Sequence, residues 1–244
     1  MEKLTKKLIV KGTLKALTGL HIGASKENVE IGGIDNPVIR CVLKKRQPYI
    51  PGSSLKGKLR SLLQQAIGEA DEKQTGSPVC QLFGAADNSD TDFDNLPKEN
   101  MEYLNKFSLR KNKKLLGHRS RLIVRDAYLT QTSEKQLFDS EYTDMPYTEM
   151  KMENHIKRIE GTAENPRQQE RIPADAEFDI EFIINVFEKD ASNKLTDTLK
   201  KSLELLNNDY LGGSGSRGYG KVMIDIDWNE MKTINISDLV SAQA

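Results

Sequence analysis

The sequence predicts an α+β fold, and three observations support this class. Three segments alternate apolar and polar residues as strands do, two segments carry apolar residues at helical spacing, and a further run rich in Leu, Ile and Val separates the helices. In chain order these segments give β-α-β-β-α-β. That order is typical of the ferredoxin-like (RRM-like) fold, so we expect one such palm, with large insertions, as a single domain over residues 1–244.

The strands are expected over residues 6–17, 121–130, 176–187 and 220–228. Alternation is clear in the first and third segments, where most residues on one face are apolar and most on the other face are polar or charged. A strand with this pattern buries one face and exposes the other. The residues expected on the buried face of these two segments are Leu8, Val10, Leu14, Ala16, Phe178, Ile180, Phe182, Ile184 and Val186.

The helices are expected over residues 53–68 and 193–209. Ser53 or Ser54 is a candidate N-cap for the first helix, and Gly68 is a candidate stop. In both helices the apolar residues fall three or four positions apart, which places them on one stripe. These residues are Leu55, Leu59, Leu62, Leu63, Ala66 and Ile67 in the first helix, and Leu195, Leu199, Leu203 and Leu206 in the second.

Long insertions are expected, because a fold of this order needs far fewer than 244 residues. They span about 18–50, 70–118 and 131–172. Insertions of this length in a compact domain are usually functional or disordered. We expect disorder in the acidic stretch 85–102. Apolar residues alternate with charged ones in 145–172, which we expect to project as a β-hairpin.

The chain carries 36 basic and 36 acidic residues, so its net charge indicates no particular partner. The charges are nevertheless segregated. Residues 36–68 and 106–125 contain bases without acids, whereas 69–102 is strongly acidic. A neutral chain with this distribution can present a strongly positive face. Scattered solvated charge is the alternative interpretation, but it predicts more mixing of the two signs.

Several classes of protein are disfavoured. Apolar runs are too short to span a bilayer, and the first residues lack the apolar segment of a signal peptide. The only cysteines, Cys41 and Cys80, show no metal-ligand spacing, and Cys80 is expected to be a buried small hydrophobe. The nucleophile elbow of a serine hydrolase is absent. We therefore expect a cytoplasmic protein without disulfides and without a membrane partner.

The most informative motif is the glycine-rich segment 211–221, which contains five glycines in nine positions. Glycines let a backbone approach a partner closely, and its amides can hold phosphate. Arg217 and Lys221 add positive charge, and Tyr219 supplies a ring that could stack on a base. An ordinary glycine turn is the alternative, although turns rarely need five glycines.

The second motif is the start of the first helix, residues 50–60. A helix N-terminus exposes free amides and binds anions readily, and Lys56 and Arg60 lie on one side of the first turns. Gly57 inside a helix costs about 1 kcal/mol relative to alanine, which suggests that something packs or binds close to the backbone there. An ordinary capped amphipathic helix is the alternative interpretation.

Together these two motifs resemble those of the RAMP superfamily of CRISPR proteins, and most closely the backbone subunits of type III-A (Csm) effector complexes. The segments 21–23, 32–38, 124–127, 151–156 and 165–167 carry the rest of the resemblance. It implies a subunit that polymerises with other copies of itself along a guide (CRISPR) RNA, beside other Csm-complex subunits. It also implies that 145–172 is a thumb hairpin that kinks the duplex of guide and single-stranded target RNA.

The resemblance further implies that the subunit cleaves target RNA in a metal-dependent reaction that requires Asp35, with Mg²⁺ as the expected ion. RNA supplies its own nucleophile, the 2′-OH, so the protein needs mainly to align a nucleotide and place one carboxylate. That chemistry predicts products with a 2′,3′-cyclic phosphate and a 5′-OH. Without the resemblance, an Asp before Asn-Pro is more often a turn former.

RNA contact is the role expected for a larger set of residues. Arg119 and Arg121 have the weaker claim, because a solvated loop explains them almost as well. Two alternatives remain: a structural subunit in which Asp35 is idle, and a RAMP endonuclease that processes repeat RNA. The thumb segment argues against the second. The expected RNA-binding residues are His21, Ser53, Ser54, Lys56, Gly57, Arg60, Arg119, Arg121, Arg125, Lys151, Met152, Pro166, Arg167, Gly213, Ser214, Gly215, Ser216, Arg217 and Tyr219.

Overall fold

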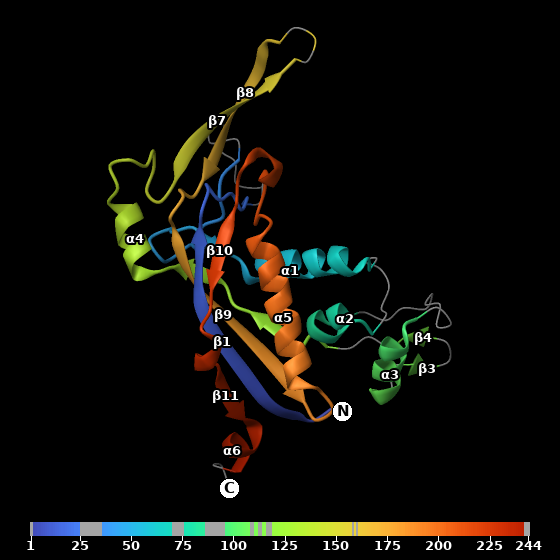
Figure 1. Cartoon of the computed structure of the whole chain (residues 1–244). Coiled ribbons are helices and arrows are strands. Elements are labelled where there is room, and N and C mark those ends of the chain that lie inside the picture. The colour runs from blue at the N-terminus through green and yellow to red at the C-terminus, as the bar shows by residue number, and fades with distance from the viewer. Residues whose placement is uncertain are drawn as a thin grey trace.

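A computed structural model shows a twisted sheet with helices against one face and a long hairpin extending from one end (Figure 1). It describes residues 2–24, 36–69, 76–85, 96–107, 110–111, 114–115, 119–157, 159 and 161–241. The elements are β1 (Leu4–Ala16), β2 (Tyr49–Ile50), α1 (Gly52–Ile67), α2 (Pro78–Phe83), α3 (Lys98–Lys106), β3 (Arg110–Lys111), β4 (Lys114–Leu115), β5 (Leu122–Val124), β6 (Ala127–Leu129), α4 (Gln131–Phe138), β7 (Glu149–Ile156), β8 (Ala163–Arg171), β9 (Glu177–Phe187), α5 (Ser192–Asn207), η3 (Gly215–Arg217), β10 (Val222–Asp225), η4 (Trp228–Glu230), β11 (Lys232–Asn235) and α6 (Ile236–Ser241).

The main sheet is antiparallel and has the strand order β10-β1-β9-β6-β2, with β5 also paired to β9 and β11 also paired to β1. Its centre is the long pair β1 and β9, in which Val10 lies opposite Phe182 and Leu14 opposite Phe178. All four side chains are buried. The strands expected over 6–17 and 176–187 are therefore confirmed, together with the apolar face assigned to each.

The other two expected strands are shorter than the sequence indicates. The segment 121–130 is divided into β5 and β6 by Arg125 and Asp126, and both parts pair with β9. The last strand ends at Asp225, and a 3₁₀ turn follows because the Asp227 side chain accepts a hydrogen bond from the backbone N–H of Asn229. Side chain–backbone bonds of this kind compete with strand pairing.

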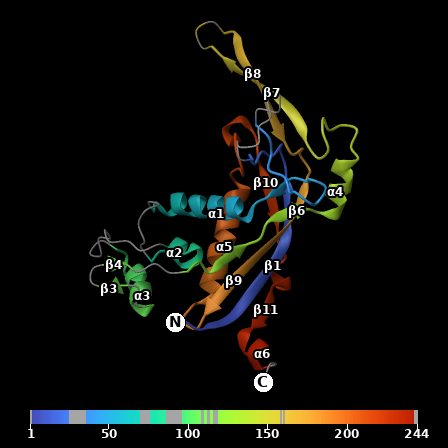
Figure 2. The ribbon, with the colours of Figure 1, turned by 180° about the vertical axis from the view of Figure 1, so that it is seen from behind.

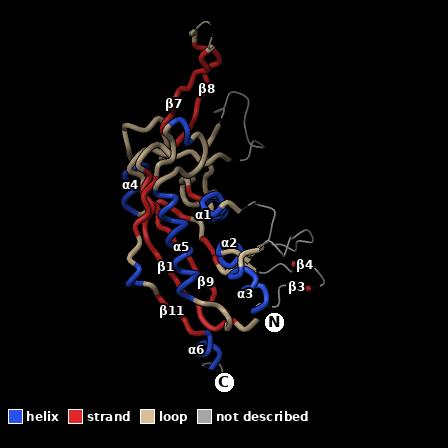
Figure 3. The backbone as a smooth tube through the Cα atoms, turned by 45° about the vertical axis from the view of Figure 1, so that its right-hand side comes forward, coloured by secondary structure: helices blue, strands red, loops and turns tan. Residues whose placement is uncertain are grey.

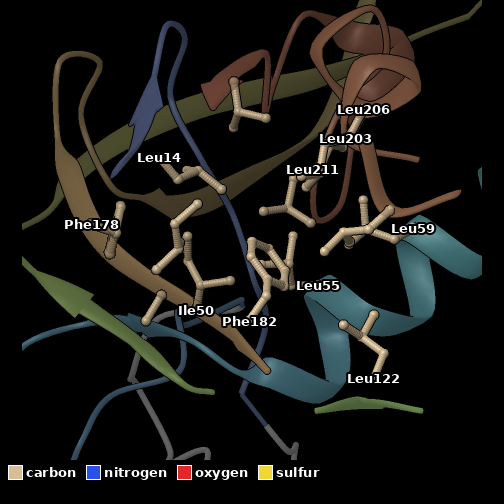
Figure 4. Close-up of a cluster of buried hydrophobic side chains, with 14 of the residues drawn as sticks. Leu14, Ile50, Leu55, Leu59, Leu122, Phe178, Phe182, Leu203, Leu206 and Leu211 are labelled. Carbon is tan, nitrogen blue, oxygen red and sulfur yellow. The ribbon is translucent and has the colours of Figure 1, made fainter. Parts of the chain in front are cut away.

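Helices α1 and α5 cover one face of the sheet (Figures 1 and 3). Figure 4 shows leucines of both helices directed toward Leu14, Phe178 and Phe182 of the sheet. The expected stripe of α5 is confirmed, but that of α1 is wrong at Ala66 and Ile67, which are exposed because the last turn of α1 passes beyond the packed region. Gly68 ends α1 with φ +70°, as the sequence predicts. The buried leucines are Leu55, Leu59, Leu62, Leu63, Leu195, Leu199, Leu203 and Leu206.

The insertions contain helices that the sequence pattern did not reveal. Cys80 lies buried in α2, as expected. The expectation of disorder across 85–102 is wrong for Lys98–Glu102, which belong to α3. This helix has a small core of its own, in which Leu104 and Phe107 are buried against Leu96, Met101 and Tyr103. Residues 86–95 lie outside the described part of the chain.

The hairpin expected over 145–172 is confirmed as β7 and β8, which form a separate two-stranded sheet. It extends away from the main sheet, as Figures 1 and 2 show from opposite sides. Its base joins the main body through the pairing of Leu20 with Ile172. We call this hairpin the thumb. Among the described helices, none has the length and apolar character that crossing a membrane requires.

Candidate nucleic-acid interface

The N-terminus of α1 is held by a carboxylate rather than by a serine. The Asp126 side chain accepts a hydrogen bond of 2.8 Å from the backbone N–H of Gly52, and no side chain caps the helix from the Pro51 position. The expectation that Ser53 or Ser54 is the cap is therefore wrong. Gly52 is needed because a Cβ there would lie 2.3 Å from the carbonyl oxygen of Val124. The negative charge of Asp126 stabilises this end of the helix dipole.

The two expected phosphate-binding bases of α1 are both partly buried. The ammonium of Lys56 donates to the Ser120 hydroxyl at 2.7 Å and to the Leu122 carbonyl oxygen at 2.8 Å. Burial lowers the pKa of Lys56, and the charge of Arg60 lowers it further. Within the described chain, the buried Nε of Arg60 has no hydrogen-bond partner. Lys56 thus fastens α1 to the start of β5 and the residues just before it, and a role in RNA contact stays a prediction for both Lys56 and Arg60.

Gly57 lies on the exposed side of α1, and its surroundings are open. In the part of the chain that the structure describes, no atom outside the helix would come within 4 Å of a Cβ at this position. The expectation that another part of the protein packs against Gly57 is therefore not met. The open space beside Gly57 leaves the close approach of a ligand as the explanation for a glycine at this position.

A base absent from the predicted RNA-binding set joins α1 to the glycine-rich loop. The ammonium of Lys58 lies 3.3 Å from an Asp209 carboxylate oxygen and 3.8 Å from the centre of the Tyr210 ring. The same ring lies against Gly215, where a Cβ would come within 2.1 Å of it. The two motifs singled out in the sequence are therefore in contact through Lys58 and Tyr210. In the sequence, the signal for this contact was an aromatic residue, Tyr210, directly before the glycine-rich segment.

The glycine-rich loop has a fixed base and an exposed tip. Gly212 has φ +79°, and a Cβ on it would lie 2.2 Å from the carbonyl oxygen of His21. Gly220 has φ +69°, and a Cβ on it would lie 2.0 Å from the Leu211 carbonyl oxygen. Backbone hydrogen bonds join Gly213 to His21, and Leu211 and Gly220 to each other. The tip is a short 3₁₀ turn whose members Ser216 and Arg217 are exposed, whereas Gly213, Ser214 and Gly215 are half-buried.

Tyr219 cannot stack on a base as the sequence suggests, because its ring is only 1% exposed. It lies 4.4 Å from the ammonium of Lys151 and 5.2 Å from the guanidinium of Arg171, both on the thumb. Burial raises the pKa of Tyr219 to about 12, and the nearby Glu153 carboxylate adds to this effect. The role of Tyr219 is to hold the loop against the base of the thumb.

Glu153 of β7 also reaches the loop. Its carboxylate lies 2.7 Å from the guanidinium of Arg217 and 3.8 Å from the Lys151 ammonium. The neighbouring Tyr219 hydroxyl, together with Arg217 and Lys151, holds the pKa of Glu153 below its ordinary value. The thumb and the loop tip are therefore joined by an ion pair, although the Arg217 side chain is still 67% exposed.

Beyond its base the thumb presents the other expected residues to solvent. Met152 is 57% exposed, and Pro166 and Arg167 on the opposite strand are exposed as well. His21 differs, because its ring is buried and its Nδ1–H donates to the Glu170 carbonyl oxygen at 2.7 Å. His21 thus ties the segment that follows β1 to the thumb.

The three arginines before and between β5 and β6 have different environments. Arg119 is exposed. Arg121 is only 1% exposed and is paired with Asp190 and Glu2, so the prediction that it contacts RNA is wrong. The Arg125 side chain is 61% exposed and lines a cavity of about 810 Å³ beside Lys11 and other polar residues of β1 and β9. The structure does not bring these arginines together.

The expected catalytic residue, Asp35, lies outside the described part of the chain. The sequence places it directly before Asn36, which is described and pairs with Gln169 of the thumb. Within the described residues, no three His, Cys, Asp or Glu side chains are grouped so that they could hold a metal ion. The expectations for Asp35 and for Mg²⁺ therefore remain predictions.

The chain was compared with models of known protein families. The model described as the RAMP superfamily matches residues 13–222. The chain therefore belongs to the RAMP superfamily, and the resemblance noted in its sequence is confirmed.

The curated relatives within that superfamily share one description. The CRISPR system Cms endoribonuclease Csm3 of Methanothermobacter thermautotrophicus is 38% identical over 241 residues, which cover 96% of this chain and 86% of the relative. The chain thus groups with the Csm3 endoribonucleases.

Two solved structures are similar to this chain. A chain of the Csm3-Csm4 subcomplex of the type III-A CRISPR-Cas interference complex aligns with a TM-score of 0.50 and 26% identity, covering 98% of this chain and 96% of that chain. Csm3 of Methanopyrus kandleri aligns with a TM-score of 0.62 at 22% identity, covering 99% of this chain and 81% of its own, which shows a shared fold.

Proposed function

We propose that the chain is the repeating guide-RNA-binding subunit of a type III-A CRISPR complex, and that it cuts the paired target RNA at regular intervals. It works in the cytoplasm with further copies of itself and with other Csm subunits. The observation that carries the proposal is the contact between α1 and the glycine-rich loop through Lys58 and Tyr210. The 38% identity to a Csm3 endoribonuclease supports the activity.

We also propose that the main sheet and helices α1 and α5 form a ferredoxin-like palm. Its four strands are β1, the pair β5 and β6 counted as one, β9 and β10. The order β10-β1-β9-β6 and the antiparallel pairing of β9 with its neighbours support this assignment. A palm of this kind presents loops and helix ends at one end of the sheet, where the thumb also begins.

Guide RNA is held by its sugar-phosphate backbone along α1 and the loop tip. Gly57 leaves space for a close approach, and Ser216 and Arg217 present exposed donors. Binding by main-chain amides and cations is independent of base identity, as a subunit that serves many guides requires. Met152 on the thumb offers an exposed apolar side chain against the duplex.

Cleavage uses the 2′-OH of the target strand as the nucleophile. The 2′-OH gives up its proton as its oxygen bonds to the adjacent phosphorus, and the bond from that phosphorus to the 5′-oxygen breaks. The leaving oxygen takes up a proton from water, so the products are a 2′,3′-cyclic phosphate and a 5′-OH. Asp35 is the carboxylate that we assign to this step. Mg²⁺ ordinarily binds through one or two carboxylates together with substrate phosphates, and bound ions of this kind stabilise developing negative charge.

The test is Asp35→Ala in a reconstituted complex with guide and target RNA, with Asp225→Asn as the matched control. Asp225 is an exposed carboxylate at the end of β10. We expect Asp35→Ala to abolish cleavage while target binding is unchanged, and chelation of divalent ions to stop the parent complex. Persistent cleavage by Asp35→Ala would show that the subunit is structural, and cutting of free repeat RNA would favour the processing endonuclease.

A further inference from the structure

The base of the thumb contains an acidic residue among the bases that are expected to contact RNA. Glu153 lies on β7, and its carboxylate is 2.7 Å from the Arg217 guanidinium of the glycine-rich loop and 3.8 Å from the Lys151 ammonium. In the register of the thumb, Glu153 also lies opposite Arg167 of β8. One carboxylate is therefore a neighbour of three bases predicted to bind RNA, two on the thumb and one on the loop.

The charge of Glu153 opposes RNA binding at this place. Phosphate is attracted by the positive potential of a protein surface, and a fixed negative charge reduces that potential. The Glu153 side chain is only 15% exposed, so solvent screens its charge only in part. The Tyr219 hydroxyl and the cations Arg217 and Lys151 hold the pKa of Glu153 below its ordinary value, so the carboxylate is ionised at neutral pH. Any contribution of Glu153 to RNA binding must therefore exceed this repulsion.

Folding stability is a poor explanation for the contact between Glu153 and Arg217. The Arg217 side chain is 67% exposed, and an ion pair with so exposed a partner contributes little to stability. The loop has other contacts with the thumb, because Lys151 and Arg171 lie 4.4 Å and 5.2 Å from the centre of the buried Tyr219 ring. The loop and the thumb are therefore joined without the Arg217 guanidinium.

What the ion pair does supply is a fixed orientation of an arginine. The main chain at Arg217 is held in a 3₁₀ turn, where the N–H of Arg217 donates to Ser214 and that of Gly218 donates to Gly215, both at 2.9 Å. At the far end of the side chain, Nη1 donates to the carboxylate of Glu153. Among the described residues, no acceptor is bonded to Nη2 or Nε. Because a guanidinium is a planar fork that can bind phosphate through two N–H groups, its other nitrogens stay free for that contact.

We propose that Glu153 is a positioning residue for guide-RNA binding, which holds the Arg217 guanidinium in an orientation that can bind a phosphate. This inference rests on the proposed function. Ordering one long side chain at an interface weakens affinity by about 2- to 13-fold. Glu153 removes this cost, because it orders Arg217 before RNA arrives. Lys151, at the longer distance of 3.8 Å, is ordered in the same way but less tightly.

The two effects of Glu153 on RNA affinity have opposite signs, so removing its charge decides between them. Glu153→Gln preserves the shape of the side chain. Affinity rises in this variant if repulsion of phosphate is the larger effect, and it falls if positioning is the larger one. We expect affinity for guide RNA to fall by about fivefold, because the cost of ordering Arg217 and Lys151 exceeds the gain from removing one partly screened charge.

Glu164→Gln is the matched control. Glu164 is another carboxylate of the thumb, and it lies 3.6 Å from the ammonium of Lys157, a base outside the predicted RNA-binding set. Its replacement removes the same charge without releasing Arg217. We expect the affinity of this variant for guide RNA to be within about twofold of the parent.

The measurement is a titration with labelled single-stranded guide RNA over a salt series, made with the full chain and with the reconstituted complex. Arg217→Ala should weaken binding and reduce the slope of log affinity against log salt concentration by about 0.7, as one lost phosphate contact on a single strand predicts. Glu153→Gln should keep the parental slope, because Arg217 still reaches the phosphate. When Arg217 is already alanine, Glu153→Gln should change affinity by about twofold or less, because the residue through which it acts is absent.

Each outcome separates positioning from the alternatives. If Glu153→Gln binds guide RNA as tightly as the parent or more tightly, the positioning role is wrong. A fivefold loss that persists in the Arg217→Ala background would show that Glu153 acts through the fold of the thumb, and it would overturn the proposal too. If Arg217→Ala binds like the parent with an unchanged slope, the loop does not contact the guide and the proposed RNA path is itself wrong. If Arg217→Ala loses a contact while Glu153→Gln does not weaken binding, only the positioning role is wrong.

Discussion

Replacing Arg121 by alanine should destabilise the protein strongly without weakening RNA binding by the folded fraction. The Arg121 side chain is 1% exposed, and its Nε lies 3.0 Å from an Asp190 oxygen whose side chain is itself 3% exposed. Glu2 pairs with the same guanidinium at 2.7 Å. The ring of Phe187 lies 4.3 Å away. The variant would leave the Asp190 carboxylate buried without this cation.

The magnitude follows from that burial. Removing one partner of a buried ion pair costs about 3–5 kcal/mol, because the remaining charge is uncompensated. Asp190 keeps one hydrogen bond, from the Phe187 N–H at 2.9 Å, so we expect the lower end, about 3 kcal/mol. For a chain of this size, that corresponds to a decrease in melting temperature of about 6–12 °C.

Urea denaturation and thermal melting measure the loss, and Arg119→Ala is the control. Arg119 is exposed two residues earlier, and its replacement should change the free energy of unfolding by less than about 0.5 kcal/mol. RNA affinity is then measured over a salt series below the melting transition. The slope of log affinity against log salt concentration reports the number of phosphate contacts. If Arg121→Ala were as stable as the parent and its slope corresponded to one phosphate contact fewer, the assignment of Arg121 to the interior would be refuted.

Two further variants test the loop and its contact with the thumb. Gly212→Ala places a Cβ against the His21 carbonyl oxygen at φ +79°, so it should lower the free energy of unfolding by about 1–3 kcal/mol and weaken guide-RNA binding. Gly57→Ala has open space around it, so in urea denaturation it should be neutral or stabilising. Equal effects of the two variants on stability would contradict this contrast. The pKa of Glu153 is lowered in the folded protein, so its ion pair stabilises the fold fully at pH values above the ordinary Glu pKa of ~4.3. This stabilisation is lost as the pH falls through the lower pKa of the folded state. The difference in unfolding free energy between the parent and Glu153→Gln should therefore shrink between pH 6 and about pH 3.5, and a constant difference would argue against this ion pair.

The strands and helices that bury one whole face could be predicted from the sequence, because buried residues two apart in a strand, or three or four apart in a helix, are local information. β1, β9 and α5 are examples. The division of 121–130 into β5 and β6 could not be predicted in this way. It occurs where Asp126 turns to accept the N–H of Gly52, a residue 74 positions away in the chain. Contacts of that range leave no periodic pattern.

The candidate site shows the same limit for individual side chains. Arg119 and Arg121 are identical in type and two residues apart, yet only Arg121 meets Asp190 and Glu2 in the interior. Glu170 resembles any other charged residue of the thumb until Arg40 and Val38 are brought to it from the first insertion. The motifs located the interface, whereas distant partners decide which residues remain free to face a ligand.

The glycine-rich loop illustrates why both kinds of information are needed. Its glycines are evident in the sequence, but their use becomes clear only when His21 and Tyr210 are seen against them. The base of the loop is fixed by His21, and the start of its tip at Gly215 lies against the ring of Tyr210, which Lys58 links to α1. A cradle for phosphate requires amides held in place before the ligand arrives, since ordering them on binding would cost affinity. A fixed base with an exposed tip at Ser216 and Arg217 meets that requirement.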